Sequence, residues 1–201
     1  KTYTATTNAN GVAGVKPGLN TGKYSATIKF AGDSTYEAQQ IKIDFSILPT
    51  IKSKAISKYY EGDTQYSATF LNGNGKPLAN TYVKISINGK TYNRKTNANG
   101  IAYFAINLKP GTYKVTSTDP ITGYQLTNTF KILSTIKTAD VSKVYTDGKN
   151  FYAKFFKNDG NPLAGKSVKF NLNGNNYQVT TNQNGVAHVS LLTLQPGTYK
   201  I

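Results

Sequence analysis

Short stretches of the chain alternate apolar and polar residues, and each stretch is bounded by a turn signal. Within residues 82–87 the apolar residues are Val83, Ile85 and Ile87, and this period of two predicts a half-buried β-strand. Asn88-Gly89 follows, and it predicts a two-residue hairpin because this pair accepts the positive φ angles of a type I′ turn. No stretch shows the apolar period of a helix. The pattern therefore predicts an all-β protein.

These stretches and their turns recur along the chain. The recurring segments are Gly75–Ala79 with Gly160–Ala164, Pro110–Lys114 with Pro196–Lys200, and Thr96–Gly100 with Thr7–Gly11 and Thr181–Gly185. The period, about 85 residues, is the length of a small domain rather than of a solenoid turn. The sequence therefore predicts a tandem array of one small domain.

One full repeat extends from about residue 51 to residue 133. Its expected strands lie near 52–60, 65–71, 81–87, 90–96, 101–107, 112–118 and 125–132. Seven short strands separated by turns fit an immunoglobulin-like sandwich, in which two sheets bury the inward half of each strand. The predicted domains are the C-terminal part of a repeat at 1–50, a complete repeat at 51–135 and the N-terminal part of a third at 136–201.

The repeats at the two ends are predicted to be incomplete. Residues 1–50 align with the last four strands of the full repeat, and residues 136–201 stop after the Gly-Thr-Tyr-Lys strand. A half sandwich exposes its core face and its unpaired edges, which destabilises it. Two explanations stay open: a longer parent chain continues at both ends, or strands from another molecule complete each half.

The net charge is +15, from 24 lysine and arginine residues against nine acids, and a basic balance suggests anionic partners. Arg94 is the only arginine, whereas nucleic-acid readers rely on arginine for bidentate contacts, so no nucleic-acid partner is expected. The lysines are scattered through the strand-like stretches. This distribution indicates solvated positions that discourage edge-to-edge strand pairing, with an anionic surface polymer as the alternative partner.

Cysteine is absent and no long apolar run occurs. No stretch of this segment is therefore expected to span a membrane. The lack of cysteine is compatible with a surface protein whose packing suffices without disulfides.

Several motifs resemble those of known surface modules. Residues 22–36 resemble the Gly-x-Tyr…Gly-Asp-x-x-Tyr signature of bacterial-type immunoglobulin-like repeats. Residues 75–79, 96–100 and 110–113 are similar to the Gly-x-Pro-Leu-Ala, Thr-x-x-Asn-Gly and Pro-Gly-Thr-Tyr motifs of immunoglobulin-like and Cna-B-like modules. The Asn-, Lys- and Tyr-rich composition is similar to the repeats of methanogen adhesin-like proteins. The resemblance implies a tandem immunoglobulin-like surface protein and says little about its ligand.

Cna-B-like modules often carry an internal Lys–Asn isopeptide bond promoted by a buried acid. The position implied for the acid is Ser117, and the position implied for the lysine falls in Thr69-Phe70-Leu71. Lys157 is the nearest candidate lysine in the third repeat, which ends before its acid position. We therefore expect no isopeptide crosslink in the central repeat.

Few residues suggest catalysis or metal binding. His188 is the only histidine, and because no partner recurs with it we expect a surface or edge position. Glu61-Gly62-Asp63 and Asp147-Gly148 hint at a weak Ca²⁺ site, although turn residues are the preferred interpretation. We predict no catalytic residue, no metal site and no cofactor.

The recurring tyrosines have two interpretations. Tyr24, Tyr113 and Tyr199 stand in Gly-x-Tyr strands and are expected to be core or corner positions. Tyr59-Tyr60 and Val144-Tyr145 stand near the start of their repeats and are expected to pack at a domain junction. Exposed tyrosines among lysines are the alternative, as a platform for carbohydrate or nucleic acid.

The sequence predicts a non-catalytic, extracellular stalk on the cell surface, in which neighbouring repeats project a distal functional domain. The short linker at residues 133–136, which lacks a flexible Gly/Ser tract, supports this hypothesis. The first alternative is an extracellular filament subunit that assembles end to end by strand complementation between incomplete terminal domains. The second alternative is a lysine-rich module that binds anionic cell-wall or host polymers.

Overall fold

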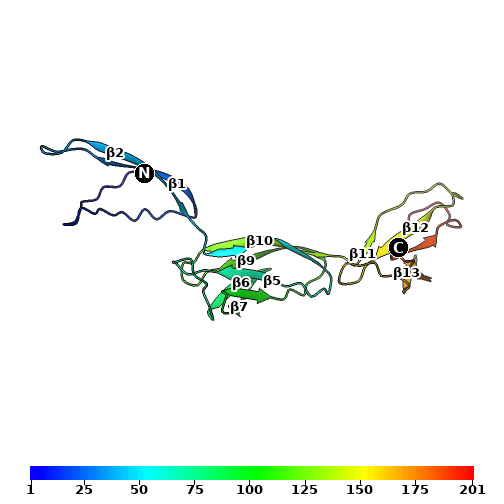
Figure 1. The fold of residues 1–201 in the computed structure, drawn as a ribbon. Helices are drawn as coiled ribbons and strands as arrows, with labels where there is room; N and C mark the ends of the chain where they lie inside the picture. The colour runs from blue at the N-terminus through cyan, green and yellow to red at the C-terminus, as the bar shows by residue number, and fades with distance from the viewer. The chain divides into compact units, whose positions relative to one another are not determined.

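The computed structural model describes all 201 residues and contains strands but no helix. The protein is therefore all-β, as predicted, and it has no helix that could cross a lipid bilayer. The chain divides into two compact units, Lys1–Thr50 and Ile51–Ile201 (Figure 1). The further division of the second unit near residue 135 stays a prediction. We call residues 1–50, 51–135 and 136–201 the first, central and third repeats.

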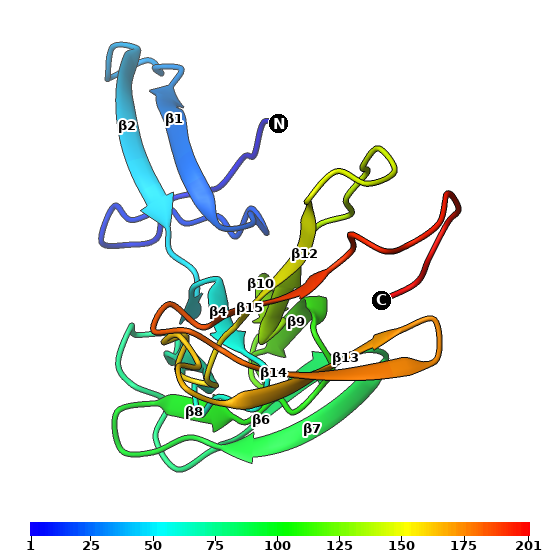
Figure 2. The same ribbon diagram turned by 90° about the vertical axis from the view of Figure 1, so that its right-hand side faces the viewer.

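The first repeat contains one antiparallel hairpin, formed by β1 (Gly22–Phe30) and β2 (Gln39–Ile47). Figure 2 shows this pair as a long two-stranded ribbon. Two strands replace the four that the repeat alignment predicted, because residues 1–21 form no strand. In the central repeat the segments that correspond to residues 1–21 pair with strands that the first repeat does not contain.

The hairpin of the first repeat leaves an apolar face uncovered. Ile28, Ile41, Ile43 and Phe45 are exposed. Phe45 lies opposite Tyr24 on the neighbouring strand, and Phe130 lies opposite Tyr113 in the same way in the central repeat, where Phe130 is fully buried. The same sequence pattern is therefore buried in one repeat and exposed in another.

The central repeat is a sandwich of two sheets. One sheet has the order β4-β10-β9-β6-β7 and the other has the order β3-β5-β8. The bounds are β3 Ile51–Ser53, β4 Ile56–Tyr59, β5 Tyr66–Phe70, β6 Tyr82–Ile87, β7 Lys90–Lys95, β8 Ile101–Phe104, β9 Gly111–Thr118 and β10 Gln125–Leu133. All pairs are antiparallel except β4 with β10. This arrangement confirms the immunoglobulin-like sandwich.

The first predicted strand of the central repeat, 52–60, is in fact two strands in different sheets. β3 pairs with β5, whereas β4 pairs with β10 in parallel. The chain crosses from one sheet to the other at Lys54 and Ala55, which belong to no strand. Eight strands therefore replace the predicted seven.

The core of the central repeat lies between the two sheets. Its largest fully buried apolar side chains are Tyr66, Phe70 and Phe130. Burial of each such side chain stabilises the fold by roughly 1.5–3 kcal/mol. The hydroxyl groups of Tyr66 and Ser117 lie 2.9 Å apart, so each of these buried polar groups has a partner inside the core.

The third repeat has a smaller core and five strands. They are β11 Ile136–Thr138, β12 Asn150–Phe155, β13 Ser167–Leu172, β14 Asn175–Thr180 and β15 Val186–Ser190, arranged as β11-β12-β15 and β13-β14. The predicted Gly-Thr-Tyr-Lys strand at 197–200 is not a strand. In the central repeat the corresponding strand, β9, is hydrogen-bonded between β10 and β6, and the third repeat has no counterpart of β10.

Candidate functional site

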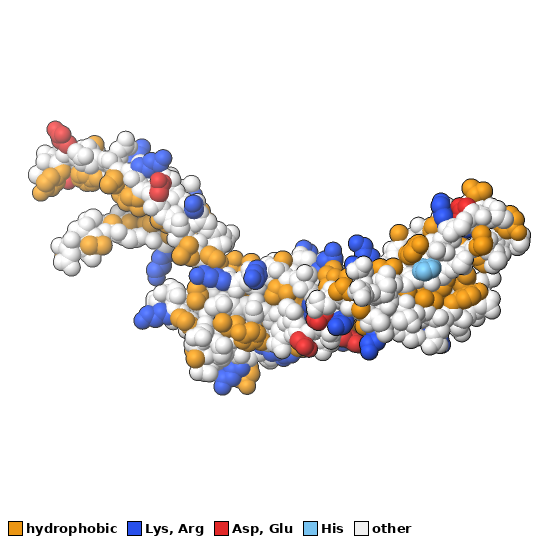
Figure 3. All heavy atoms as spheres, turned by 45° about the vertical axis from the view of Figure 1, so that its right-hand side comes forward, with side chains coloured by type: hydrophobic (Ala, Val, Ile, Leu, Met, Phe, Trp, Pro, Cys, Tyr) orange, Lys and Arg blue, Asp and Glu red, His pale blue; other side chains and the backbone are white.

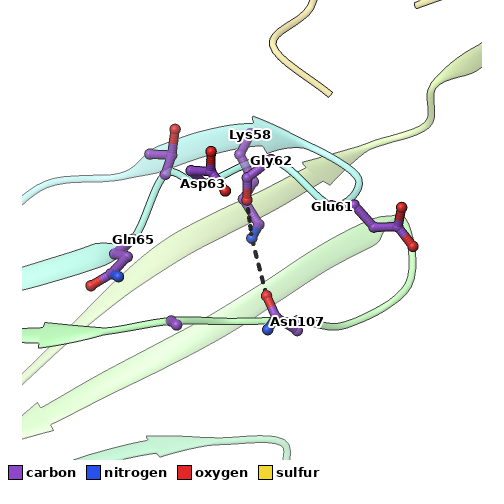
Figure 4. Close-up of a pocket in the computed structure, with 8 residues that line it drawn as sticks. Lys58, Glu61, Gly62, Asp63, Gln65 and Asn107 are labelled. Atoms are coloured by element: carbon purple, nitrogen blue, oxygen red, sulfur yellow. Dashed lines mark hydrogen bonds between the residues drawn. The ribbon is translucent and has the colours of Figure 1, made fainter. Parts of the chain in front are cut away.

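A shallow pocket of about 290 Å³ lies at the end of β4 in the central repeat (Figure 4). It is lined by Lys58, Glu61, Gly62, Asp63, Thr64, Gln65, Ala105 and Asn107. Lys58 is only 6 % exposed and its side chain crosses the pocket. The signal for this buried lysine is the strand pattern, because Lys58 stands two residues after the inward-facing Ile56 on β4.

Neutral oxygens surround the ammonium group of Lys58. Its Nζ donates to the Gly62 carbonyl oxygen at 2.8 Å and to Asn107 Oδ1 at 3.5 Å. The only ion pair of the chain lies elsewhere, between Lys149 and Asp147 at 3.9 Å. A buried ammonium group is costly unless it is hydrogen-bonded, so Lys58 is tied to the backbone at Gly62. The arrangement fixes a loop and brings no carboxylate to the lysine as a partner.

The positions that the resemblance implied for an isopeptide bond have other roles. Ser117 is fully buried and bonded to the Tyr66 hydroxyl, while Phe70 belongs to the core. The lysine that the structure brings beside an asparagine amide in the central repeat is instead Lys58, next to Asn107. A local sequence pattern does not reveal this pair, because the two positions are 49 apart in the sequence and only the fold brings them together.

The acidic residues that hinted at calcium shape loops. Glu61 adopts a φ of 60° and the Gly62 N–H donates to the Tyr59 carbonyl at 3.0 Å. Asp147 accepts hydrogen bonds from the backbone N–H groups of Lys149 and Val144. No group of three or more His, Cys, Asp or Glu residues is placed to hold a metal ion. These contacts support the interpretation as turn residues.

Asp147 and a second loop carboxylate, Asp159, have a lowered pKa. At Asp147 desolvation alone would raise the pKa, but hydrogen bonds from the N–H groups of Lys149 and Val144, together with the nearby lysine charges, lower it below the usual 3.8. Hydrogen bonds from the Asn161 backbone and side chain lower the pKa of Asp159. Hydrogen bonds to the charged form favour ionisation, so both side chains act as structural acceptors.

His188 lies exposed on β15, an edge strand of its sheet, as expected. Its ring is 5.2 Å from the ring of Tyr152, which is its cross-strand neighbour on β12. Figure 3 shows the imidazole at the molecular surface. The contact is a cross-strand aromatic pair of the kind that stabilises sheets.

The tyrosines of the Gly-x-Tyr motif occupy one repeated corner geometry. Tyr24, Tyr113 and Tyr199 each donate their hydroxyl to the carbonyl four residues earlier, at 2.8, 2.7 and 3.0 Å. The expected corner position is therefore confirmed in all three repeats. Such a bond fixes the chain as it enters the following segment.

Tyr59 lies where the central repeat meets the third repeat, as predicted. We call residues Tyr59–Gly62 the outgoing loop and residues Phe156–Asn161, which follow β12, the incoming turn. The rings of Tyr59 and Phe156 are 5.2 Å apart at an interplanar angle of 36°. Asn158 Nδ2 donates to the Glu61 carbonyl at 3.4 Å. The other predicted junction residues lie elsewhere: Tyr60 packs against the core of the central repeat, Val144 is 76 % exposed, and the Tyr145 hydroxyl accepts a hydrogen bond from Gln195 of its own repeat.

The linker between these two repeats is hydrogen-bonded as well as short. Only Ser134 and Thr135 separate β10 from β11. The Ser134 hydroxyl accepts the Ile136 N–H at 3.0 Å, and the Thr135 carbonyl accepts the Phe156 N–H at 2.8 Å. The linker therefore behaves as part of the fold rather than as a flexible tether.

The basic side chains do not form one concentrated patch on the face seen in Figure 3. They are spread between apolar and neutral residues, as the sequence suggested. On this face the dispersed basic side chains give a weak positive field rather than a focused anion site.

Comparison with known proteins gives one family match. Residues 71–150 match the SpaA family, described as a prealbumin-like fold domain. The match covers less than half of the chain and extends from the central repeat into the third. No curated protein sequence is similar to the chain at a significant level.

The similar solved structures are distant. They include a Ca²⁺-stabilised adhesin of an Antarctic bacterium that binds ice (19 % identity, 96 % of this chain, TM-score 0.27), and a 1.5-MDa bacterial ice-binding adhesin (14 %, 85 %, 0.27). A third is the SGBP-B protein of the Bacteroides ovatus mixed-linkage glucan utilisation locus, in complex with a heptasaccharide (12 %, 94 %, 0.27). The chain spans 55 %, 63 % and 56 % of these chains respectively.

Proposed function

We propose that the chain is a non-catalytic, adhesin-type spacer on the cell surface, which holds a distal functional domain away from the envelope. The observation that supports this proposal most directly is the two-residue, hydrogen-bonded linker between the central and third repeats. A chain that keeps a distal domain at a set distance from the cell needs folded repeats and short connections between them. Its function is then mechanical and requires no active site.

The repeated geometry gives further support. The corner tyrosine and the Asn-x-Asn-Gly turn recur in each repeat with the same hydrogen bonds. What recurs is thus the set of contacts that holds the fold. In a spacer every repeat needs those contacts, whereas a binding site needs special residues in only one of them.

The test is single-molecule force spectroscopy on the whole chain, held by its two ends. We expect a discrete unfolding step of roughly 300 Å for the central repeat, since an extended chain spans up to about 3.6 Å per residue. Continuous lengthening without a step would contradict the proposal. Turnover of a substrate, or saturable binding of a neutral glycan by the purified chain, would also overturn it.

A second candidate is a filament subunit that assembles by strand complementation. It is favoured by the exposed face of β1 and β2, where Ile28, Ile41 and Ile43 lie open. Strands of another molecule would bury these side chains and pair with the free edges. Mass measured over a range of protein concentrations separates the candidates: monomers at every concentration support the spacer, and an end-to-end ladder supports the filament.

A third candidate is a module that binds anionic wall or host polymers. It is favoured by the net charge of +15 and by the single ion pair, because most lysines keep their charge available. Binding of a teichoic-acid-like polyphosphate that weakens steeply with salt would support it. Absence of binding at low ionic strength would exclude it.

A further inference from the structure

The contact between the central and third repeats leaves no room for a side chain at two glycines. A Cβ placed on Gly62 of the outgoing loop would lie 2.7 Å from the Asn158 carbonyl oxygen of the incoming turn. A Cβ on Gly160 of the incoming turn would lie 2.6 Å from the Tyr59 ring of the outgoing loop. Real Cβ atoms do not approach other atoms so closely, so each repeat presents a glycine to the other.

We propose that the outgoing loop and the incoming turn form a specific inter-repeat joint that holds the central and third repeats at one fixed angle. The joint is an interface between two repeats of one chain. The outgoing loop accepts a turn that has glycine at the Gly160 position and an aromatic residue at the Phe156 position. This inference rests on the proposed spacer function and goes further, because it assigns the residues that set the angle.

A comparison of equivalent turns separates the joint from ordinary turn chemistry. Gly75 of the central repeat is the equivalent of Gly160, and the two have φ angles of +73° and +89°. Both N–H groups close the same turn, Gly75 to Asn72 and Gly160 to Lys157. A Cβ on Gly75 would meet nothing within 4 Å. The backbone therefore favours glycine at both positions, but the close contact with another repeat exists only at Gly160.

Two hydrogen bonds from the rest of the central repeat hold the outgoing loop in the conformation that contacts the incoming turn. Tyr60 N–H donates to the Leu133 carbonyl at 2.9 Å, which ties the loop to the end of β10. Lys58 Nζ holds the Gly62 carbonyl at 2.8 Å. Glu61 adopts a φ of 60°, a conformation that is uncommon for residues other than glycine and persists only where the surroundings enforce it.

The same unusual loop recurs one repeat later. Thr146, the equivalent of Glu61, has a φ of 68°, and a β-branched residue is a true outlier there. Two different residues adopt the same strained φ at equivalent positions, so the backbone shape of the loop recurs even though its sequence changes. In the central repeat that shape receives Asn158 and Phe156.

The aromatic side of the joint is fixed as well. Lys154 Nζ lies 5.3 Å from the Phe156 ring centroid, and the Tyr59 ring lies 5.2 Å from it. The Phe156 backbone N–H is bonded to the linker at Thr135. The backbone and ring of Phe156 are therefore both held in place on the third repeat, so that movement of one repeat relative to the other would break the ring contact with Tyr59.

The experiment measures the distance between two spin labels by double electron–electron resonance in the whole chain. Because the chain has no cysteine, Lys131→Cys and Lys169→Cys place one label at an exposed position in the central repeat and one in the third repeat. The joint predicts a single narrow distance distribution. A broad distribution in the otherwise unchanged chain would overturn the proposal.

Glycine variants then test the mechanism. Gly160→Ala and Gly62→Ala are expected to broaden or shift the distribution, with a width increase of about twofold, because repeats without a fitted interface move freely. Gly75→Ala carries the same φ penalty as Gly160→Ala and should leave the distribution narrow. Equal broadening by Gly75→Ala, or none by either joint variant, would contradict the joint. Amide spectra of each variant verify that both repeats stay folded.

Lys58→Met tests the positioning role of the buried lysine. The variant keeps the apolar stem and loses the bond to Gly62, so it should broaden the label distance while the core spectrum stays unchanged. An unchanged distance distribution would show that Lys58 does not position the joint. If the joint is flexible, the spin-label distances will be broad, but force spectroscopy will still show the discrete unfolding steps of a spacer. Failure of this inference can therefore be distinguished from failure of the proposed function, on which it rests.

Discussion

Asn97 organises its turn through its side chain. Its Oδ1 accepts the N–H groups of Asn99 and Ile101, both at 3.0 Å, and Asn8 and Asn182 hold the corresponding turns in the same way. This local chemistry can be read from the Asn-x-Asn-Gly motif, since asparagine mimics a backbone turn and glycine accepts positive φ. The buried amine of Lys58 could not be read in the same way, because its partners come from distant residues.

We predict that Gly100→Ala destabilises the protein more than Gly11→Ala does. Both glycines have a φ near +73°, which costs alanine about 1 kcal/mol. A Cβ on Gly100 would also lie 2.5 Å from the Phe70 carbonyl oxygen, whereas Gly11 has open space. We expect a loss of more than about 2 kcal/mol for Gly100→Ala by urea unfolding. Equal losses at the two positions would show that the contact with Phe70 is unimportant.

The incoming turn should loosen in acid. The folded-state pKa of Asp159 lies below 3.8, mainly because Asn161 donates hydrogen bonds to the carboxylate. Its stabilising effect is thus complete above the unfolded pKa and is lost as pH falls through the folded pKa. We expect faster hydrogen exchange at the Asn161 amide below about pH 3.8. Asp159→Asn keeps an acceptor that does not titrate, and exchange in that variant should lack the added acid dependence.

At the scale of elements, the alternating pattern predicts most strands but not their sheets. β6, β7 and the turn between them lie where Asn88-Gly89 and the period of two place them. The predicted strand 52–60 is divided because β4 finds a parallel partner in β10, more than 70 residues away. A local pattern cannot specify such a partner, since both halves of the segment have strand-like sequence.

Thr96 links the segment after β7 to the segment before β6 through one buried hydroxyl. Its Oγ1 donates to the Leu78 carbonyl at 2.6 Å and accepts the Thr81 N–H at 3.0 Å. We predict that Thr96→Val, which leaves both groups without this partner, lowers the free energy of unfolding by about 1–3 kcal/mol. Thr7→Val is the matched control, because Thr7 is exposed in the first repeat. Thermal unfolding of both variants is the measurement, and equal effects would contradict the proposed link.

Over the whole molecule, repeats of one sequence pattern differ in how well their cores are covered. The central repeat buries thirteen residues in its main core cluster, and the third repeat buries seven. We therefore expect the central repeat to be the more stable of the two, since stability follows buried apolar area.

The net charge predicts a salt effect on the whole chain. With +15 charges and one ion pair, self-repulsion should destabilise the fold at low ionic strength. Raising NaCl from about 10 to 200 mM should raise the Tm by a few degrees because the Debye length shortens. A variant with fewer charges should gain less; suitable exposed lysines for replacement by glutamine are Lys52, Lys84, Lys90 and Lys169. A Tm independent of salt in both proteins would contradict this expectation.

The sequence by itself determined the strand class, the repeat period and the turns, because these follow from side-chain alternation, glycine and asparagine over a few neighbouring residues. Tertiary structure decided which equivalent positions are buried: Phe130 is covered while Phe45 is exposed. It also decided which glycine touches another repeat, Gly160 rather than Gly75. The physical reason is that burial and close contact depend on partners far away in the chain, which no local pattern encodes.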